Sequence, residues 1–254
     1  MSFMRLADQR PSSSIRARSY GCWGGLRQIV RGAVAAAVCG LVLLAATEIP
    51  LASAKPPVKI VALGDSLTAG LGLRERDGFV PRLQAALAAK GIAAAVENAG
   101  VSGDTAGDGL ARLDWSVPPQ TDAVILELGA NDMLRGLDPR TTRDALDAML
   151  RRLQERHIAV LLCGMRAAPN LGAEYAAAFE RIYPELAAKY GVPLYPFFLD
   201  GVAADLSLMQ HDGLHPNAAG VAVIVARILP QVENLIAHIR SAQILNGPAA
   251  IRRS

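Results

Sequence analysis

The sequence predicts an α/β fold of three layers, with helices on both faces of a central, mostly parallel five-stranded sheet. Apolar runs of strand length recur along the chain, and segments with helical spacing of apolar residues separate them. The runs are nearly continuous rather than alternating, which is typical of parallel strands buried on both faces. With 254 residues, 52% of them hydrophobic, the chain is long enough to bury one large core. We therefore expect ligands to bind at the carboxyl ends of the strands.

Five apolar segments are predicted to be the strands of this sheet, namely residues 58–63, 93–99, 122–128, 158–165 and 192–198. The second is the weakest, and the fifth is interrupted by Pro196. Cys163 lies inside the fourth run, where a cysteine is expected to be a buried strand residue rather than a nucleophile. Since the other two cysteines lie before residue 55, we expect no disulfide within the domain.

The segments between the strands predict helices, because their apolar residues recur every three or four positions. They cover residues 79–91, 105–115, 141–157, 174–191 and 217–239. Two of them end at glycine, a common helix terminator. Pro230 is expected to kink or break the last helix, and the tail after about residue 240 is expected to be flexible.

The first 54 residues are interpreted as a signal peptide. Arginines precede a short apolar run at residues 32–46, and "ASA" at residues 52–54 predicts cleavage after Ala54. An uncleaved N-terminal anchor is the alternative. Cleavage would export a single domain of residues 55–254 to the periplasm or the medium, with no stable insertion in the membrane. That domain has a net charge of −1, so its charge gives no argument for binding nucleic acid.

Polar residues follow the ends of several predicted strands, and we expect them to lie together at one edge of the sheet. They are "GDS" (64–66), "NAGVSGDT" (98–105), "GAND" (129–132) and "HDGLHP" (211–216). Each has a simpler interpretation as a turn or a helix cap. Ser66 in particular has the residue type of a helix N-cap, and Asp65 and Asp132 are expected to be structural turn formers.

Together these groups supply what ester hydrolysis at a serine requires. Ser66 is a candidate nucleophile, and His215 is a candidate base that Asp212, three residues earlier, would orient. The developing oxyanion needs hydrogen-bond donors, and we expect the backbone N–H groups of Ser66 and Gly103 and the side-chain amide of Asn131 to supply them.

The same stretches resemble the sequence blocks of the SGNH, or GDSL, hydrolase family. "GDSLTAG", the glycine of "SGDT", the asparagine of "GAND" and "DGLHP" carry the resemblance, which covers nearly all of residues 57–238. It implies a flavodoxin-like fold, catalytic residues Ser66, Asp212 and His215, and an oxyanion hole of Ser66, Gly103 and Asn131. It also implies hydrolysis of acyl or aryl esters or thioesters through an acyl-enzyme on Ser66, without a metal or another cofactor.

Apolar residues near the candidate site predict a groove for the acyl group of a small ester or thioester. The candidates are Leu71, Leu73, Met165, Pro169 and Phe197. No cluster of basic residues surrounds the site in the sequence, so a strongly anionic substrate is not required.

Two other classes of protein remain as alternatives. "GDS" and "GAND" are weakly similar to turns of metal-dependent phosphoesterases, but that class needs more ligands than four histidines, two of them on one loop, provide. A non-catalytic binding module with the same fold is the second alternative, and a complete triad argues against it.

Overall fold

The structure is a computed structural model that describes residues 56–203 and 205–245. The predicted signal peptide and its cleavage site lie outside these residues. The described chain forms a five-stranded sheet in the order β2-β1-β3-β4-β5, in which every neighbouring pair is parallel. The strands are β1 (Val58–Gly64), β2 (Ala94–Gly100), β3 (Ala123–Glu127), β4 (Ala159–Cys163) and β5 (Leu194–Tyr195). The predicted α/β class is therefore confirmed.

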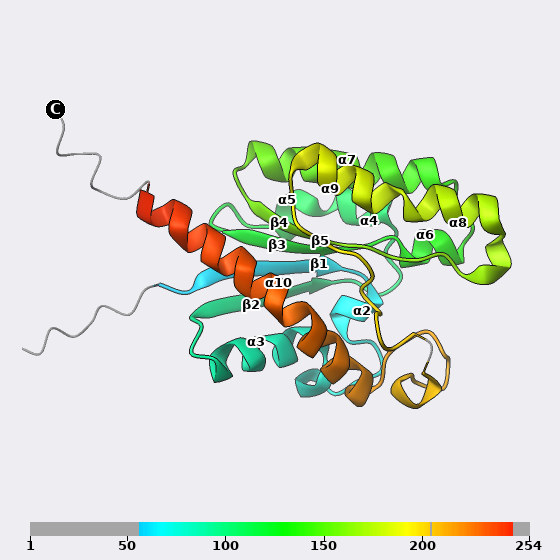
Figure 1. The fold of residues 1–254 in the computed structure, drawn as a ribbon, viewed down its shortest axis with the longest axis horizontal. Helices are drawn as coiled ribbons and strands as arrows, with labels where there is room; N and C mark the ends of the chain where they lie inside the picture. Colours follow the sequence, from blue (N-terminus) through cyan, green and yellow to red (C-terminus); the bar gives the residue numbers. More distant parts are fainter. Residues whose placement is uncertain (1–55, 204, 246–254) are drawn as a thin grey trace, which may run out of the picture. The chain divides into compact units, whose positions relative to one another are not determined.

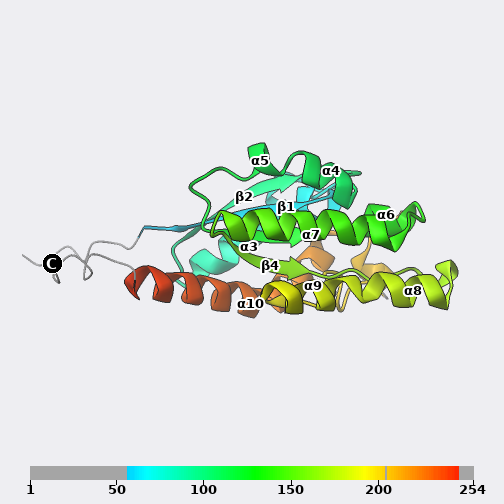
Figure 2. The ribbon, with the colours of Figure 1, turned by 90° about the horizontal axis from the view of Figure 1, so that it is seen from above.

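Helices cover both faces of the sheet. They are α2 (Ser66–Ala69), α3 (Phe79–Ala89), α4 (Ala106–Ala111), α5 (Leu113–Ser116), α6 (Ala130–Leu134), α7 (Pro139–Glu155), α8 (Ala173–Glu180), α9 (Ile182–Tyr190) and α10 (Ala218–Leu245). α3 packs against α10 on one face, whereas α7 packs between α4 and α9 on the other. Figure 1 shows α3 below the sheet and α7 and α9 above it. Figure 2 shows α7 and α9 running side by side along the strands.

The core explains why the apolar runs form the strands that they do. All five residues of β3 are buried, as are six of the seven residues of β1. β2 lies at the edge of the sheet and is mostly half-buried or exposed, which accounts for its weaker apolar pattern. Because all five strands run in the same direction, their carboxyl ends meet at one edge, to the right in Figure 1, beside α2 and α6.

Two predicted helices are divided in the structure. The segment at 174–191 forms α8 and α9, which are separated at Arg181. Pro184 lies in the first turn of α9, where no helical hydrogen bond needs its missing N–H. Its ring would clash with the carbonyl four residues earlier in a continuous helix, which favours the break between α8 and α9. The segment at 105–115 likewise forms α4 and α5, which meet at Arg112.

The last helix is longer than its sequence predicted. α10 is continuous across Pro230 and ends at Leu245, so no break occurs, and residues 240–245 are helical. The exposed proline removes one hydrogen bond, while Ile228 and Val232 on either side of it are buried in the core. Arg240 donates to the carbonyl of Ala93, which fixes the last turns to the body of the domain. α10 is long and apolar enough to cross a membrane, but here it packs against α3 and β4 as a core helix.

Candidate active site

Ser66 begins α2, directly after β1. The N-cap of α2 is Asp65, whose Oδ1 accepts a hydrogen bond of 3.0 Å from the Leu67 N–H. The interpretation of Ser66 as the cap is therefore wrong, and its hydroxyl is available for another partner. Gly64 is required before this turn, because a Cβ there would lie 2.1 Å from Thr68 Oγ1 and 2.7 Å from the Glu127 carbonyl oxygen.

Ser66, His215 and Asp212 form one chain of hydrogen bonds. Ser66 Oγ lies 2.8 Å from His215 Nε2, and His215 Nδ1 lies 2.6 Å from Asp212 Oδ2. Because a carboxylate only accepts, Nδ1 carries the proton that is shared with Asp212, and Nε2 is left to accept from the serine hydroxyl. The bond to His215 lowers the pKa of Asp212 to about 2, so this carboxyl is ionised at neutral pH.

The loop before α10 fixes the acid and the base. Asp212 Oδ1 accepts the backbone N–H groups of Leu214 (2.9 Å) and His215 (3.0 Å). Gly213, which directly follows Asp212, has a φ of 67°, a backbone conformation that favours glycine. The short Asp–His spacing in the sequence therefore becomes a self-contained turn that presents both side chains to Ser66.

Two backbone N–H groups are free to bind an oxyanion. Among the described residues, the N–H groups of Ser66 and Gly103 donate to no protein acceptor. Gly103 has a φ of 90°, and its carbonyl accepts a hydrogen bond of 2.7 Å from the Arg135 guanidinium. The hydrogen bond from Arg135 therefore helps to fix the loop that contains Gly103.

The side-chain amide of Asn131 also reaches the site, but it is already bonded. Its Nδ2 lies 3.0 Å from the Asp104 carbonyl oxygen and 3.2 Å from Asp65 Oδ2. Because both contacts are oxygens that accept, the NH₂ group and not the amide oxygen faces them. Asp132 beside it accepts from the Ala106 N–H, which agrees with its expected structural role.

A buried arginine that was not predicted from the sequence connects these loops. Arg112 donates to Asp104 Oδ2 (2.6 Å), to the Gly64 carbonyl (2.9 Å) and to Ser116 Oγ (3.1 Å). Its side chain is only 8% exposed. It therefore ties the loop after β2 to the end of β1, immediately before the Asp65–Ser66 turn. A single arginine in a helical segment carries no sequence signal for such a role.

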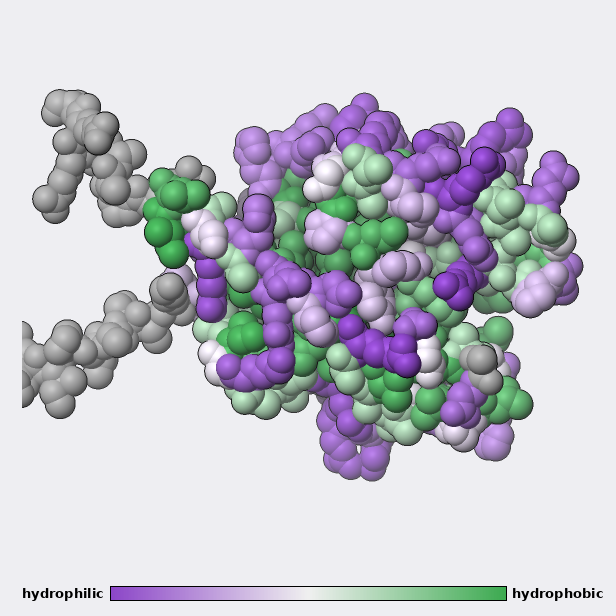
Figure 3. All heavy atoms as spheres, in the orientation of Figure 1, coloured by the Kyte–Doolittle hydropathy of each residue, from purple (hydrophilic) through white to green (hydrophobic). Residues whose placement is uncertain are grey.

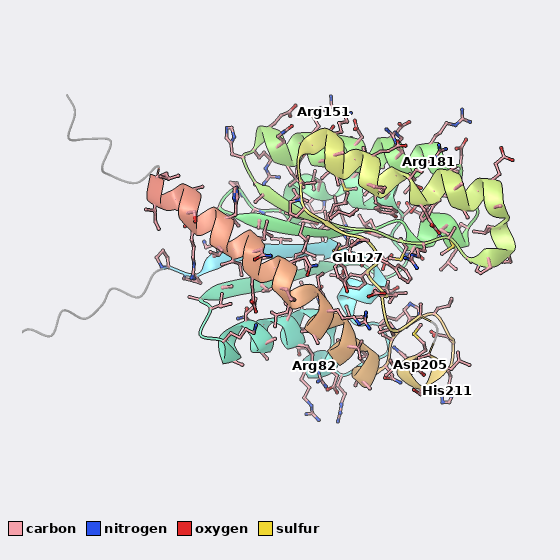
Figure 4. All side chains as sticks on the ribbon, viewed as in Figure 1. Arg82, Glu127, Arg151, Arg181, Asp205 and His211 are labelled. Atoms are coloured by element: carbon pink, nitrogen blue, oxygen red, sulfur yellow. The ribbon has the colours of Figure 1, made fainter. Side chains whose placement is uncertain are left out.

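Two carboxyl groups lie buried beneath the serine. Burial raises the pKa of Asp65 to about 6. Burial and the neighbouring Asp65 raise the pKa of Glu127 well above its ordinary value of 4.5. Thr68 Oγ1 donates to Glu127 Oε2 (2.8 Å), but Glu127 Oε1 has no hydrogen-bond partner within the described part of the chain. Figure 4 places Glu127 close to α2. Both shifts favour the protonated form of these carboxyl groups over that of an exposed carboxyl.

The raised pKa of Glu127 predicts how stability depends on pH. This pKa is higher in the folded state than in the unfolded state, so the unfolded chain binds fewer protons above about pH 4.5 and stability falls as the pH rises. Glu127→Gln removes this loss, because glutamine is already neutral. In urea unfolding the variant should gain stability relative to the parent as the pH rises above about 4.5. The exposed Glu97→Gln is the control, and parallel curves for parent and Glu127→Gln would contradict the inference.

An apolar cavity of about 470 Å³ opens beside Ser66 and His215. Met165, Pro169 and Phe197 line it, as the sequence predicted, but Leu71 and Leu73 do not. Leu73 lines a separate cavity of about 840 Å³, behind Asp212, because the chain turns away after α2. Leu199, which follows the fifth predicted strand, also lines the cavity at Ser66, as expected, whereas other lining residues were missed in the sequence, including Leu67, Met133, Leu134, Met209 and Leu214. They come from segments whose apolar residues looked like ordinary packing.

Neither a metal site nor a reactive thiol is evident in the described part of the chain. No cluster of three or more potential ligand side chains occurs within residues 56–203 and 205–245. Cys163 is buried in β4, and burial raises the pKa of its thiol well above its ordinary value. His211 lies on the exposed loop before α10, where it lines the separate cavity behind Asp212 and not the cavity at Ser66 (Figure 4).

Here a serine is hydrogen-bonded to a histidine, which is in turn hydrogen-bonded to an aspartate. Together with free N–H donors at the end of a parallel strand, this is the geometry of a serine hydrolase. The sequence matches the GDSL-like Lipase/Acylhydrolase family over residues 62–223, and the chain belongs to this family.

Similar proteins agree with this assignment. The chain is 39% identical to esterase TesA of Pseudomonas aeruginosa, over 70% of this chain and 89% of that protein. It is 37% identical to thioesterase 1/protease 1/lysophospholipase L1 of Escherichia coli K12, over 70% of this chain and 85% of that protein. The crystal structure of AlinE4, an SGNH-hydrolase family esterase, matches with a TM-score of 0.60 and 46% identity, over 70% of this chain and 96% of that one.

Proposed function

We propose that this chain is a serine hydrolase that cleaves carboxylic esters or thioesters through an acyl-enzyme on Ser66. The observation that carries the proposal is the hydrogen-bonded Ser66–His215–Asp212 chain at the mouth of an apolar cavity. Relatives named esterase, arylesterase and thioesterase support the same class of reaction.

In the first half of the reaction, Ser66 attacks the ester carbonyl carbon. Its hydroxyl proton passes to His215 Nε2, 2.8 Å away, and Asp212 stabilises the imidazolium that forms. The carbonyl oxygen becomes an oxyanion that the N–H groups of Ser66 and Gly103 bind. The oxyanion competes with Asp65 for the Asn131 amide, whose 3.2 Å bond to Asp65 is the longer of its two. Collapse expels the alcohol or thiol, which takes the proton from His215.

The second half returns the enzyme to its starting state. His215 takes a proton from a water molecule, whose oxygen attacks the acyl carbon bound to Ser66. The tetrahedral intermediate uses the same donors, and its collapse releases the carboxylic acid. Ser66 Oγ recovers its proton from His215.

The acyl chain is proposed to occupy the cavity at Ser66. Apolar contact is worth about 0.8 kcal/mol per methylene, so kcat/KM should rise about fourfold for each added carbon until the cavity is full. This prediction is measured with soluble aryl esters from acetyl to octanoyl. A chelator should leave the rates unchanged, which separates this mechanism from a metal-dependent esterase.

Two leucines of similar exposure give a matched test of the location. Leu214 lines the cavity and is 48% exposed, whereas Leu71 is 46% exposed and does not line it. Leu214→Ala should flatten the dependence on chain length, and Leu71→Ala should preserve it. The same slope in both variants would place the acyl chain elsewhere.

We also propose that the protein is exported, on the basis of the arginines, the apolar run and "ASA" in the first 54 residues. N-terminal sequencing of the exported protein should then begin at Lys55. Recovery of residues that precede Ala52 on that protein would instead favour a retained anchor.

A further inference from the structure

Large apolar side chains are exposed mainly at one edge of this domain. Nine are exposed among the described residues, and six of these lie on short helices and loops that follow the carboxyl ends of the strands. The six, which we call the apolar rim, are Leu71, Val101, Leu134, Leu137, Leu206 and Leu214. In Figure 3 apolar surface is visible at the right-hand end of the molecule, on both sides of a notch, as well as in the middle and at the left of this face. Scattered exposed leucines need no explanation, but a set confined to one end marks an interaction surface.

The rim is continuous with the mouth of the cavity at Ser66. Leu134 and Leu214 belong both to the rim and to the cavity lining, which also includes Ser66. Leu206, which is 79% exposed, extends the rim outward on the segment before α10. A surface that covered the rim would therefore face the opening of the cavity directly.

Two arginines near this mouth form no ion pair. No carboxylate among the described residues lies within ion-pair distance of Arg135 or Arg166. Arg166 lines the cavity and lies 5.0 Å from the centre of the Phe197 ring. Arg135 directly follows the lining residue Leu134, donates to the Gly103 carbonyl, and acts on Asp108 only at longer range, where it helps to lower the pKa of that carboxyl. Neither arginine has its positive charge neutralised by a direct ion pair.

Most of the acidic groups on this edge are already engaged. Three of them have ion-pair partners, Asp104 with Arg112, Asp138 with Arg140 and Asp200 with Arg227, while Asp108, Asp205 and Asp212 accept hydrogen bonds from Thr105, Ser207 and His215. The two arginines are therefore the cations at the mouth that are available to phosphate groups. Exposed apolar side chains together with free arginines match the chemistry of a phospholipid surface, which offers acyl chains beneath anionic phosphates.

We propose that the apolar rim docks on a phospholipid surface, with Arg135 and Arg166 contacting lipid phosphates and the cavity at Ser66 opening toward the lipid. Docking would deliver an acyl chain to the cavity without crossing water. The orientation rests on the proposed function, but docking itself does not require catalysis. Docking at the surface is also distinct from insertion, because no described helix leaves the core to enter the lipid.

The test measures binding of the full chain to vesicles by sedimentation. The vesicles contain phosphatidylethanolamine and phosphatidylglycerol, and the protein carries Ser66→Ala so that lipid hydrolysis plays no part. Leu206→Asp and Leu137→Asp should each weaken partitioning by about tenfold or more, because each removes an apolar contact and adds a charge. Neither residue lines the cavity at Ser66, so the same substitutions with Ser66 intact should leave hydrolysis of a soluble acetyl ester unchanged.

Leu245→Asp is the matched control, because Leu245 is 82% exposed and lies at the end of α10, away from the rim. All variants share the same N-terminal residues, so differences between them report on the described domain. Retained binding of Leu245→Asp, with weaker binding at high salt and to phosphatidylcholine alone, would support the proposal. Absence of vesicle binding, equal binding of Leu206→Asp, or a dimer in light scattering that Leu206→Asp dissociates would overturn it. Because Ser66→Ala is used throughout, these outcomes are independent of whether Ser66 is the nucleophile.

Discussion

Ser66→Ala should lower turnover of aryl esters by several orders of magnitude while leaving the protein folded. The substitution removes the atom that attacks the carbonyl carbon, and no neighbouring hydroxyl is bonded to His215 in its place. Stability should change little, because the cap of α2 is Asp65 and not Ser66. Single-turnover and steady-state kinetics, with circular dichroism to confirm folding, measure the effect.

His215→Ala should cause a similar loss, and the double variant should be little worse than either single variant. The two residues act as one unit, so their effects are not additive. Asn170→Ala is a suitable control, because Asn170 is exposed near the cavity and does not line it. Multiplicative losses in the double variant would mean that Ser66 and His215 act independently, which would contradict the mechanism.

Asn131→Ala should lower kcat by about 10²–10³ with little change in KM. A donor that binds mainly the oxyanion stabilises the transition state more than the bound ester. The affinity of the variant for a transition-state analogue should fall in parallel with kcat.

The bonds of Asn131 to Asp104 and Asp65 provide a second readout. If the residue only held these two loops together, Asn131→Ala would lower stability and leave the kinetics of the folded fraction nearly intact. A folded Asn131→Ala variant with parental kcat would exclude it from the oxyanion hole. The two N–H groups of Ser66 and Gly103 would then be the remaining donors.

The sequence predicted the sheet because burial on both faces leaves an unbroken apolar run in each strand. β3 and β4 lie within one to two residues of their predicted bounds for this reason. β5 contains only two residues, and Pro196 directly after it has no N–H to donate. α10 extends further than predicted, and the single hydrogen bond of Arg240 to the Ala93 carbonyl, which helps to hold its end, leaves no periodic pattern in the sequence.

The site was partly predictable for a related reason. Ser66, Gly103, Asn131 and His215 follow strand ends, and parallel topology brings such positions together. Arg112 was not predictable, because its three bonds depend on how α4 and α5 fold back on the end of β1.

The raised pKa of Glu127 and the position of Leu71 outside the cavity also follow from tertiary packing alone. The burial that raises the pKa of Glu127 involves α2 and β1, neither of which is near it in sequence. Leu71 directly follows the α2 turn, and nothing in its neighbours indicates that it faces away from the cavity.

Covalent labelling by a fluorophosphonate, followed by mass spectrometry of the labelled peptide, tests whether Ser66 is the nucleophile. One adduct should form rapidly on Ser66 of the parent, and it should be lost in Ser66→Ala. His215→Ala should label far more slowly, since the hydroxyl then lacks its base. Labelling that persists in a folded Ser66→Ala variant, or an adduct on another serine of the parent, would contradict the assignment of Ser66 as the nucleophile.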